Sequence, residues 1–117
     1  MIQIYGIPNC DTVKKAMAWL KENDVAFEFH DFRKEGITTS KLQEWLRTAS
    51  VDQVLNKKSI AYKNLTEDEK QHTTVKVEAI KLMQTNTNLI KRPVIETAGT
   101  ILNGFNEAAY ANAFSKK

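Results

Sequence analysis

The chain has 117 residues, of which 42% are hydrophobic and 26% are charged, and its formal net charge is +3. This length and composition fit one globular domain, while the absence of an apolar run of ~18 residues and of a signal-peptide pattern argues against membrane insertion and export. One cysteine excludes an internal disulfide, and the scattered basic residues give no nucleic-acid footprint. We therefore expect a single cytoplasmic domain over residues 1–117, monomeric, that binds neither membranes nor DNA.

The N-terminal part reads in the order strand, helix, strand. Residues 1–5 alternate apolar and polar side chains, residues 11–23 carry an apolar stripe at helical spacing, and residues 25–32 alternate again. A strand–helix–strand unit most often forms a right-handed crossover between two parallel strands. The sequence thus predicts a parallel pair at the start of the sheet.

A mostly helical block over about residues 39–86 follows. It divides into a helix over 39–48, an irregular segment over 51–65, a short polar helix that opens at residue 66, and a helix over 75–84. Two capping boxes are predicted, one from Ser40 with Gln43 and one from Thr66 with Glu69, since a hydroxyl residue followed three positions later by Glu or Gln marks a helix start.

The C-terminal part reads as a hairpin and a helix. Residues 89–96 form a strand that contains Pro93, residues 101–103 return from a turn, and Asn106 caps a last helix in which Phe105 and Tyr110 occupy the positions of a hydrophobic staple. The whole order, β-α-β, helical insert, β-β-α, matches the thioredoxin arrangement. We predict an α/β fold with a four-stranded mixed sheet and a helical insert between the second and third strands.

Pro93 falls at the start of the third predicted strand. Proline lacks the N–H that a central strand donates, so a special backbone geometry is expected there. An ordinary trans proline in an edge strand is one interpretation. The other is a cis Arg92–Pro93 bond, which in thioredoxin-like folds packs against the active-site cysteine loop, and the presence of Cys10 at a loop-to-helix junction favours it.

Cys10 follows Pro8 and Asn9 where the first loop becomes the first helix. Unpaired backbone N–H groups and the positive end of the helix dipole favour a thiolate, which is the reactive form of cysteine. The alternative is a buried, inert thiol. His30 and His72 have no partner at ligand or triad spacing, so both are predicted to be isolated surface residues.

Two segments, Tyr5 to Ala16 and Leu89 to Val94, together resemble the arsenate reductase (ArsC) family, and within it the branch of YffB and Spx-related proteins. The resemblance covers essentially the whole chain. It implies catalytic roles for Cys10 as the nucleophile and for Arg92 as an oxyanion-binding residue. It also implies a substrate-binding set with no metal: Asn9, Asp11, Thr12, Lys14, Lys57, Lys91 and Pro93.

The sequence also departs from the family pattern. Two arginines of the arsenate reductases fall near Asn56 and Gly104, and neither position holds arginine here, so poor arsenate reduction is expected. Val13 stands where many Spx regulators carry the second cysteine of a redox switch.

These features favour a one-cysteine thiol or oxyanion reductase with no bound cofactor. Its Cys10 thiolate forms a mixed disulfide that an external thiol such as glutathione resolves, and glutaredoxin is a further candidate partner. The resemblance also leaves open a Spx-like regulator that binds RNA polymerase and has no enzymatic activity.

Overall fold

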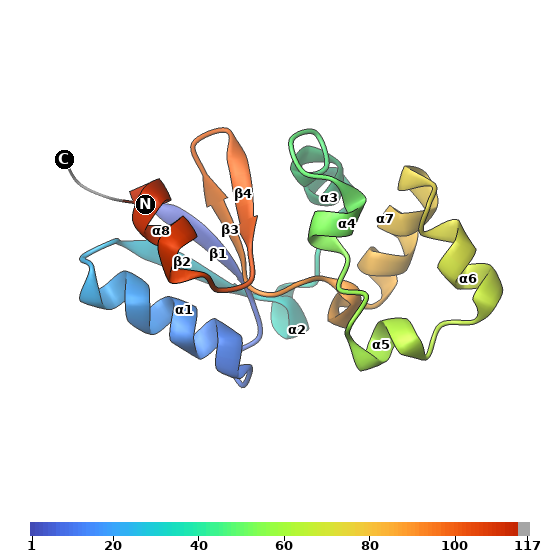
Figure 1. Ribbon diagram of the computed structural model, residues 1–117, viewed down its shortest axis with the longest axis horizontal. Helices are drawn as coiled ribbons and strands as arrows, with labels where there is room; N and C mark the ends of the chain where they lie inside the picture. The colour runs from blue at the N-terminus through green and yellow to red at the C-terminus, as the bar shows by residue number, and fades with distance from the viewer. Residues whose placement is uncertain (115–117) are drawn as a thin grey trace. The chain divides into compact units, whose positions relative to one another are not determined.

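The structure is a computed structural model that describes residues 1–114, and the chain divides into two compact units. The first joins Met1–Glu35 with the chain from Arg92 onward, and the second is Gly36–Lys91. Figure 1 shows that the first unit holds all the strands of the sheet, whereas the second is built of helices. Among the described residues, no helix combines the length and the apolar character needed to span a membrane.

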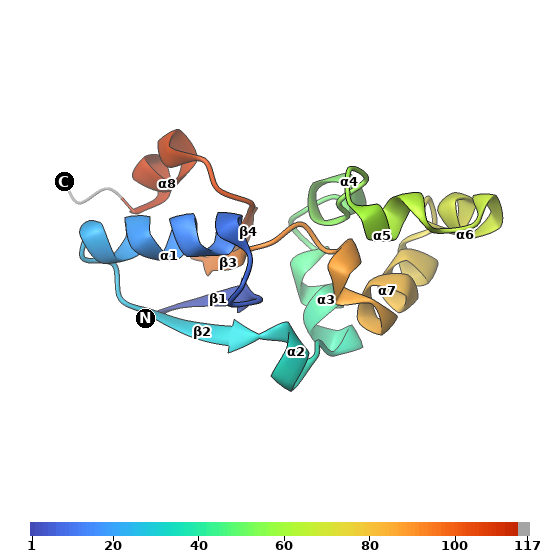
Figure 2. The same ribbon diagram turned by 90° about the horizontal axis from the view of Figure 1, so that it is seen from below.

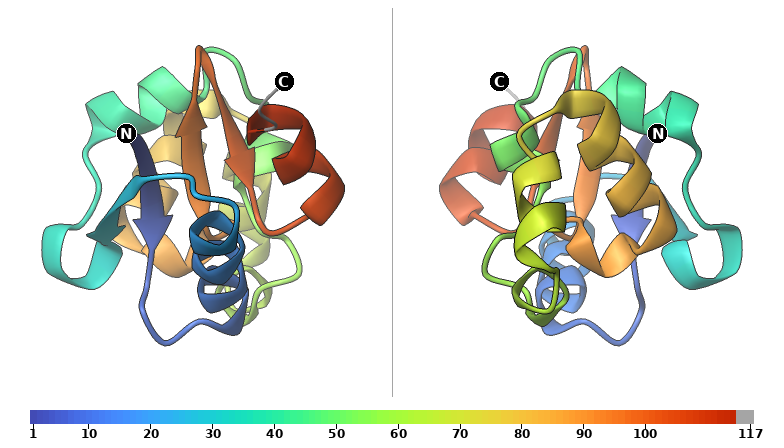
Figure 3. Two further views of the ribbon diagram at one scale, coloured as in Figure 1. Left: turned by 90° about the vertical axis from the view of Figure 1, so that its left-hand side faces the viewer. Right: turned by 90° about the vertical axis from the view of Figure 1, so that its right-hand side faces the viewer.

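The first unit is a four-stranded mixed sheet with helices. Its elements are β1 (Ile2–Gly6), α1 (Asp11–Glu22), β2 (Phe27–Asp31), α2 (Phe32–Glu35), β3 (Val94–Thr97), β4 (Thr100–Asn103) and α8 (Glu107–Phe114). The strand order is β2-β1-β3-β4, with β1 parallel to β2 and antiparallel to β3. The β3–β4 pair is the antiparallel hairpin drawn in orange in Figure 3. The predicted thioredoxin-like architecture is confirmed.

The strand register brings four chain segments to one edge of the sheet. Gly6 at the end of β1 pairs with Asp31 at the end of β2, Tyr5 pairs with Val94 at the start of β3, and Val94 pairs with Asn103 at the end of β4. Adjacent strands lie about 4.8 Å apart. The loop after β1, the segment after β2, the segment before β3 and the segment after β4 therefore all leave the sheet at this edge, which we call the C-terminal edge of β1.

Helices α1 and α8 cover the same face of the sheet (Figure 2). The buried cluster beneath them combines both strands and helices: Ile4, Ala16, Leu20, Ile95 and Tyr110. Helix α8 begins as predicted, because the Asn106 side-chain oxygen accepts a hydrogen bond from the backbone N–H of Ala109 at 2.9 Å. The predicted staple is also present, with the Phe105 and Tyr110 rings edge to face at 5.1 Å.

The second unit contains α3 (Thr39–Trp45), α4 (Val51–Val54), α5 (Ile60–Lys63), α6 (Glu67–His72), α7 (Lys76–Thr85) and a 3-10 turn, η1 (Thr87–Leu89). The predicted helical block lies inside this unit. The capping box of Thr66 with Glu69 at the start of α6 is confirmed in both directions, at 3.0 and 2.9 Å.

Three local predictions for this region were wrong. The hydroxyl of Thr38, not Ser40, caps α3 by accepting from the N–H of Lys41. The segment predicted as irregular holds two short helices, α4 and α5, each capped by a serine. The strand predicted over 89–96 begins only at Val94, because Leu89 closes a 3-10 turn and Ile90 makes an isolated bridge with Leu55.

Candidate active site

Cys10 is the N-cap residue of α1. A turn at Pro8 and Asn9 separates it from β1, and its backbone is extended, with φ −103° and ψ 124°. Its carbonyl accepts the first helical hydrogen bond, from the N–H of Lys14 at 2.9 Å. The half-buried Cys10 makes no capping hydrogen bond through its side chain. Cys10 therefore stands at the chain position that a serine or aspartate commonly takes at a helix start.

Cys10 lies at the positive end of α1. The helix has 12 residues, so its aligned peptide dipoles place a partial positive charge at the first turn. The N–H groups of the first turn of a helix have no intrahelical partner and point toward the cap. Asp11 and Thr12 lie in that turn, as the sequence predicts, and Lys14 lies one turn from Cys10 on an exposed position. Their roles in substrate binding stay predictions.

The Arg92–Pro93 peptide bond is cis, as predicted from the sequence. Pro93 is buried and directly precedes β3, whereas Arg92 is half-buried. Because β3 is antiparallel to β1, this cis bond lies at the edge of the sheet where the Cys10 loop also leaves β1. Two sequence segments separated by most of the chain thus meet at one edge, and each supplies one of the two residues expected to be catalytic.

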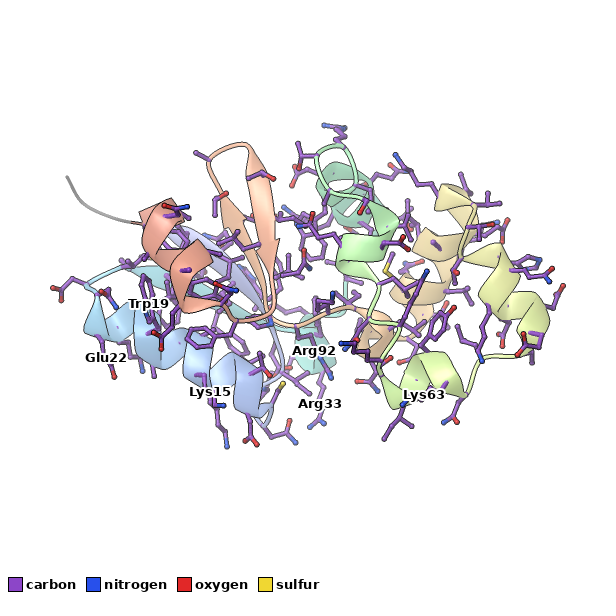
Figure 4. The ribbon with its side chains drawn as sticks, in the orientation of Figure 1. Lys15, Trp19, Glu22, Arg33, Lys63 and Arg92 are labelled. Atoms are coloured by element: carbon purple, nitrogen blue, oxygen red, sulfur yellow. The ribbon has the colours of Figure 1, made fainter. Side chains whose placement is uncertain are left out.

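Arg33 is a candidate anion-binding residue that the sequence interpretation missed. It belongs to α2, which follows β2 at the same sheet edge, and the Asp31 carboxylate accepts from its backbone N–H at 2.8 Å. Figure 4 shows Arg33 on this short helix and Arg92 on the segment that enters β3. The guanidinium of Arg33 is exposed and forms no ion pair with a carboxylate of residues 1–114. Only the strand register reveals this placement.

The prediction that His30 is an isolated surface residue was wrong. Its Nδ1 lies 2.9 Å from a carboxylate oxygen of Glu35, its Nε2 is hydrogen-bonded to the side-chain oxygen of Gln3, and its ring stacks on Tyr5 at 4.6 Å. Glu35 is the last residue of α2. His30 therefore ties α2 to the paired strands β1 and β2.

The remaining predicted residues belong to the helical unit. The ammonium of Lys57 forms an exposed ion pair with Asp52 at 3.0 Å, and this hydrogen bond, with the attraction of the carboxylate, raises the pKa of Lys57 above its ordinary value. The backbone N–H of Lys91 donates to the carbonyl of Val54 at 2.7 Å. Asn56 uses its side-chain oxygen within its own turn, accepting from the N–H of Lys58 at 3.1 Å. Within residues 1–114, no three His, Cys, Asp or Glu side chains group as a metal site.

A parallel β-α-β unit, an antiparallel hairpin entered through a cis-proline, and a cysteine at the first helix N-terminus define the thioredoxin-like class of proteins. Within that class the chain belongs to the ArsC family, whose model matches residues 5–113.

Individual relatives agree with this assignment. An uncharacterized protein of Haemophilus influenzae is 40% identical over 115 residues, covering 98% of this chain and 100% of that protein. A global transcriptional regulator Spx of Listeria monocytogenes is 27% identical over 109 residues, covering 92% of this chain and 82% of the regulator. Among solved structures, a YFFB protein matches with a TM-score of 0.90 and 38% identity, covering 98% of this chain and 100% of that one. An arsenate reductase related protein from Brucella melitensis matches with a TM-score of 0.76 and 36% identity, covering 98% and 95%.

Proposed function

We propose that this protein is a one-cysteine thiol reductase that works with glutathione. The observation that carries the proposal is Cys10 at the uncapped N-terminus of α1, at the sheet edge that also holds the cis Arg92–Pro93 bond. The arsenate reductase related protein from Brucella melitensis, at 36% identity, supports an oxidoreductase of this general kind.

The proposed reaction takes two exchange steps. The Cys10 thiolate attacks the glutathione sulfur of a glutathionylated thiol, which breaks the S–S bond, releases the substrate thiolate and leaves a mixed disulfide on Cys10. The thiolate of a second glutathione then attacks the glutathione sulfur of that mixed disulfide. Cys10 leaves as a thiolate and oxidised glutathione is released. In the net reaction the glutathionylated substrate and one glutathione thiol give the substrate thiol and oxidised glutathione, so the disulfide passes from the substrate to glutathione.

The thiol that resolves the mixed disulfide on Cys10 must come from another molecule, because the chain has no second cysteine. Arg92 is the proposed partner of a glutathione carboxylate or an oxyanion, because guanidinium groups bind such anions through two parallel hydrogen bonds. Arsenate is a poor candidate substrate, because Asn56 and Gly104 supply neither charge nor a guanidinium fork.

The decisive experiment is intact-protein mass spectrometry after incubation with oxidised glutathione. We expect the wild-type protein to gain one glutathione, which dithiothreitol removes, and the Cys10→Ser variant to gain none. A wild-type protein that gains no glutathione removes the mechanism.

A second candidate is a Spx-like regulator that binds RNA polymerase. The relatedness to Spx regulators over 92% of this chain favours it. If both the wild-type protein and the Cys10→Ser variant bind the polymerase α subunit in a pull-down, the regulator role is favoured over the thiol reductase. An empty pull-down with the wild-type chain would exclude it.

A further inference from the structure

The hydroxyl of Tyr110 makes a specific hydrogen bond at the sheet edge of the proposed site. Tyr110 lies in α8, is 1% exposed, and donates to the carbonyl of Gly104 at 2.6 Å. Its ring is held edge to face by Trp19, Phe105 and Phe114, with centroids at 5.5, 5.1 and 6.1 Å. Three aromatic contacts thus hold the ring that carries this hydroxyl.

Gly104 connects this hydroxyl to the cis-proline. Its backbone N–H donates to the carbonyl of Pro93 at 2.9 Å, one residue beyond the pairing of Val94 with Asn103. Gly104 has φ 78°, in the left-handed region. Glycine has the greatest backbone freedom of any residue, so the N–H of Gly104 stays aimed at Pro93 only if something restrains it. The hydrogen bond from Tyr110 supplies a restraint on the other side of the same residue.

Pro93 has no N–H of its own, so its carbonyl is the backbone group that links it to Gly104, the residue after β4. Arg92 precedes Pro93 and is the residue that the proposed function assigns to a glutathione carboxylate or an oxyanion. A shift of Gly104 would therefore move the segment that carries this anion-binding residue, without touching the Cys10 thiol.

We propose that Tyr110 is a positioning residue for substrate binding, acting through Gly104 on the cis Arg92–Pro93 segment. This inference rests on the proposed function. Burial raises the pKa of the Tyr110 phenol, so the hydroxyl remains a hydrogen-bond donor throughout the neutral pH range in which thiol exchange is measured.

The test uses Tyr110→Phe, which removes the hydroxyl and keeps the ring. The rate of mixed-disulfide formation is measured against oxidised glutathione concentration, and the rate of Cys10 alkylation is measured with iodoacetamide, which needs no backbone partner. We expect the half-saturating glutathione concentration to rise about three- to tenfold, which is the size of effect that loss of one hydrogen bond produces. The limiting rate and the alkylation rate should each change less than about twofold.

Two further variants separate positioning from general destabilisation. Tyr62→Phe makes the same chemical change in α5, in the other unit, and should leave every rate unchanged. Phe114→Leu weakens the packing around the Tyr110 ring and keeps its hydroxyl. At a loss of thermal stability similar to that of Tyr110→Phe, it should raise the half-saturating glutathione concentration far less than Tyr110→Phe does. An equal effect of Phe114→Leu and Tyr110→Phe would overturn the inference.

Amide hydrogen exchange gives a readout that needs no substrate. Tyr110→Phe should increase the exchange rate of the Gly104 amide by a larger factor than the exchange rates of the β1 amides. An equal increase at Gly104 and in β1 overturns the inference. If the wild-type protein reacts with glutathione and Tyr110→Phe matches it at every concentration, only the role of Tyr110 is overturned. If the wild-type protein forms no mixed disulfide, the proposed function fails and this role fails with it.

Discussion

Replacement of Gly6 by alanine should destabilise the junction that carries Cys10. Gly6 ends β1 and is buried, and a Cβ atom added there would lie 2.8 Å from one methyl carbon of Val13 and 3.5 Å from the other. Val13 is 0% exposed and lies in the first turn of α1, three positions after Cys10. A β-branched residue in a helix has one strongly preferred rotamer, so Val13 has no ready way to turn aside.

The expected cost of Gly6→Ala is about 1–3 kcal/mol of unfolding free energy, the usual range for an extra methyl group in a packed interior. Val13→Ala alone should cost about 1.5–3 kcal/mol from lost burial. The two changes should not add, because removing the Val13 methyls removes the clash. We expect the double variant to be no less stable than Val13→Ala alone, which corresponds to a coupling of about 1–3 kcal/mol.

Urea unfolding followed by tryptophan fluorescence measures these differences. Gly99→Ala is the matched control: Gly99 has φ 81° and nothing within 4 Å of an added Cβ. Its cost of about 1 kcal/mol comes from backbone conformation alone, so it should add to that of Val13→Ala. Additive behaviour of Gly6→Ala with Val13→Ala, or a Gly6→Ala variant as stable as wild type, would refute the proposed close packing of β1 against α1.

Three further outcomes are expected. Thr66→Ala should destabilise α6 by about 1 kcal/mol through loss of its capping box, seen as faster amide exchange in that helix with little change in Cys10 reactivity. Arg33→Gln should slow mixed-disulfide formation with oxidised glutathione, which is anionic, about two- to fivefold at low salt and leave it unchanged at high salt. Lys21→Gln, at the end of α1 away from Cys10, should not slow it at either salt concentration. Burial raises the pKa of the Tyr110 phenol in the folded protein, so above about pH 10 the unfolded chain loses the phenol proton before the folded protein does. Above that pH, the unfolding free energy of wild type relative to Tyr110→Phe should fall by up to about 1.4 kcal/mol per pH unit. A difference between the two proteins that does not change with pH contradicts this prediction.

The elements with their own local signal were predicted from the sequence. Helix α1 has an apolar stripe over three turns, α6 has its capping box, and α8 has both Asn106 and a staple. The cis bond at Pro93 was predicted because a proline at the start of a sheet strand coincided with a cysteine at a helix start. Apart from the cis bond, whose prediction also used the distant Cys10, each of these signals lies within a few residues of the feature it predicts.

The errors arose where local pattern was too short or was misleading. Helices α4 and α5 have four residues each, too few to show a period, and only the serines at 50 and 59 marked their starts. Leu89 and Ile90 are apolar and buried, as strand residues are, but they close a turn. The contact of His30 with Gln3 depends on the pairing of β1 with β2, which no short window of sequence contains. Its contact with Glu35 depends on the turn into α2 directly after β2.

The same distinction divides the candidate site itself. Four segments leave the sheet at the C-terminal edge of β1, and the sequence identified two of them, the loop to Cys10 and the segment at Arg92, because each carries a motif of its own. The other two, with Arg33 after β2 and Gly104 after β4, carry no motif and are placed only by strand register. A thiol exchange site needs more than its nucleophile, since the substrate must be held in line with the attacking sulfur. We therefore expect these two segments to contribute to substrate affinity together with Arg92, and variants in them should change substrate binding more than the intrinsic reactivity of the thiol.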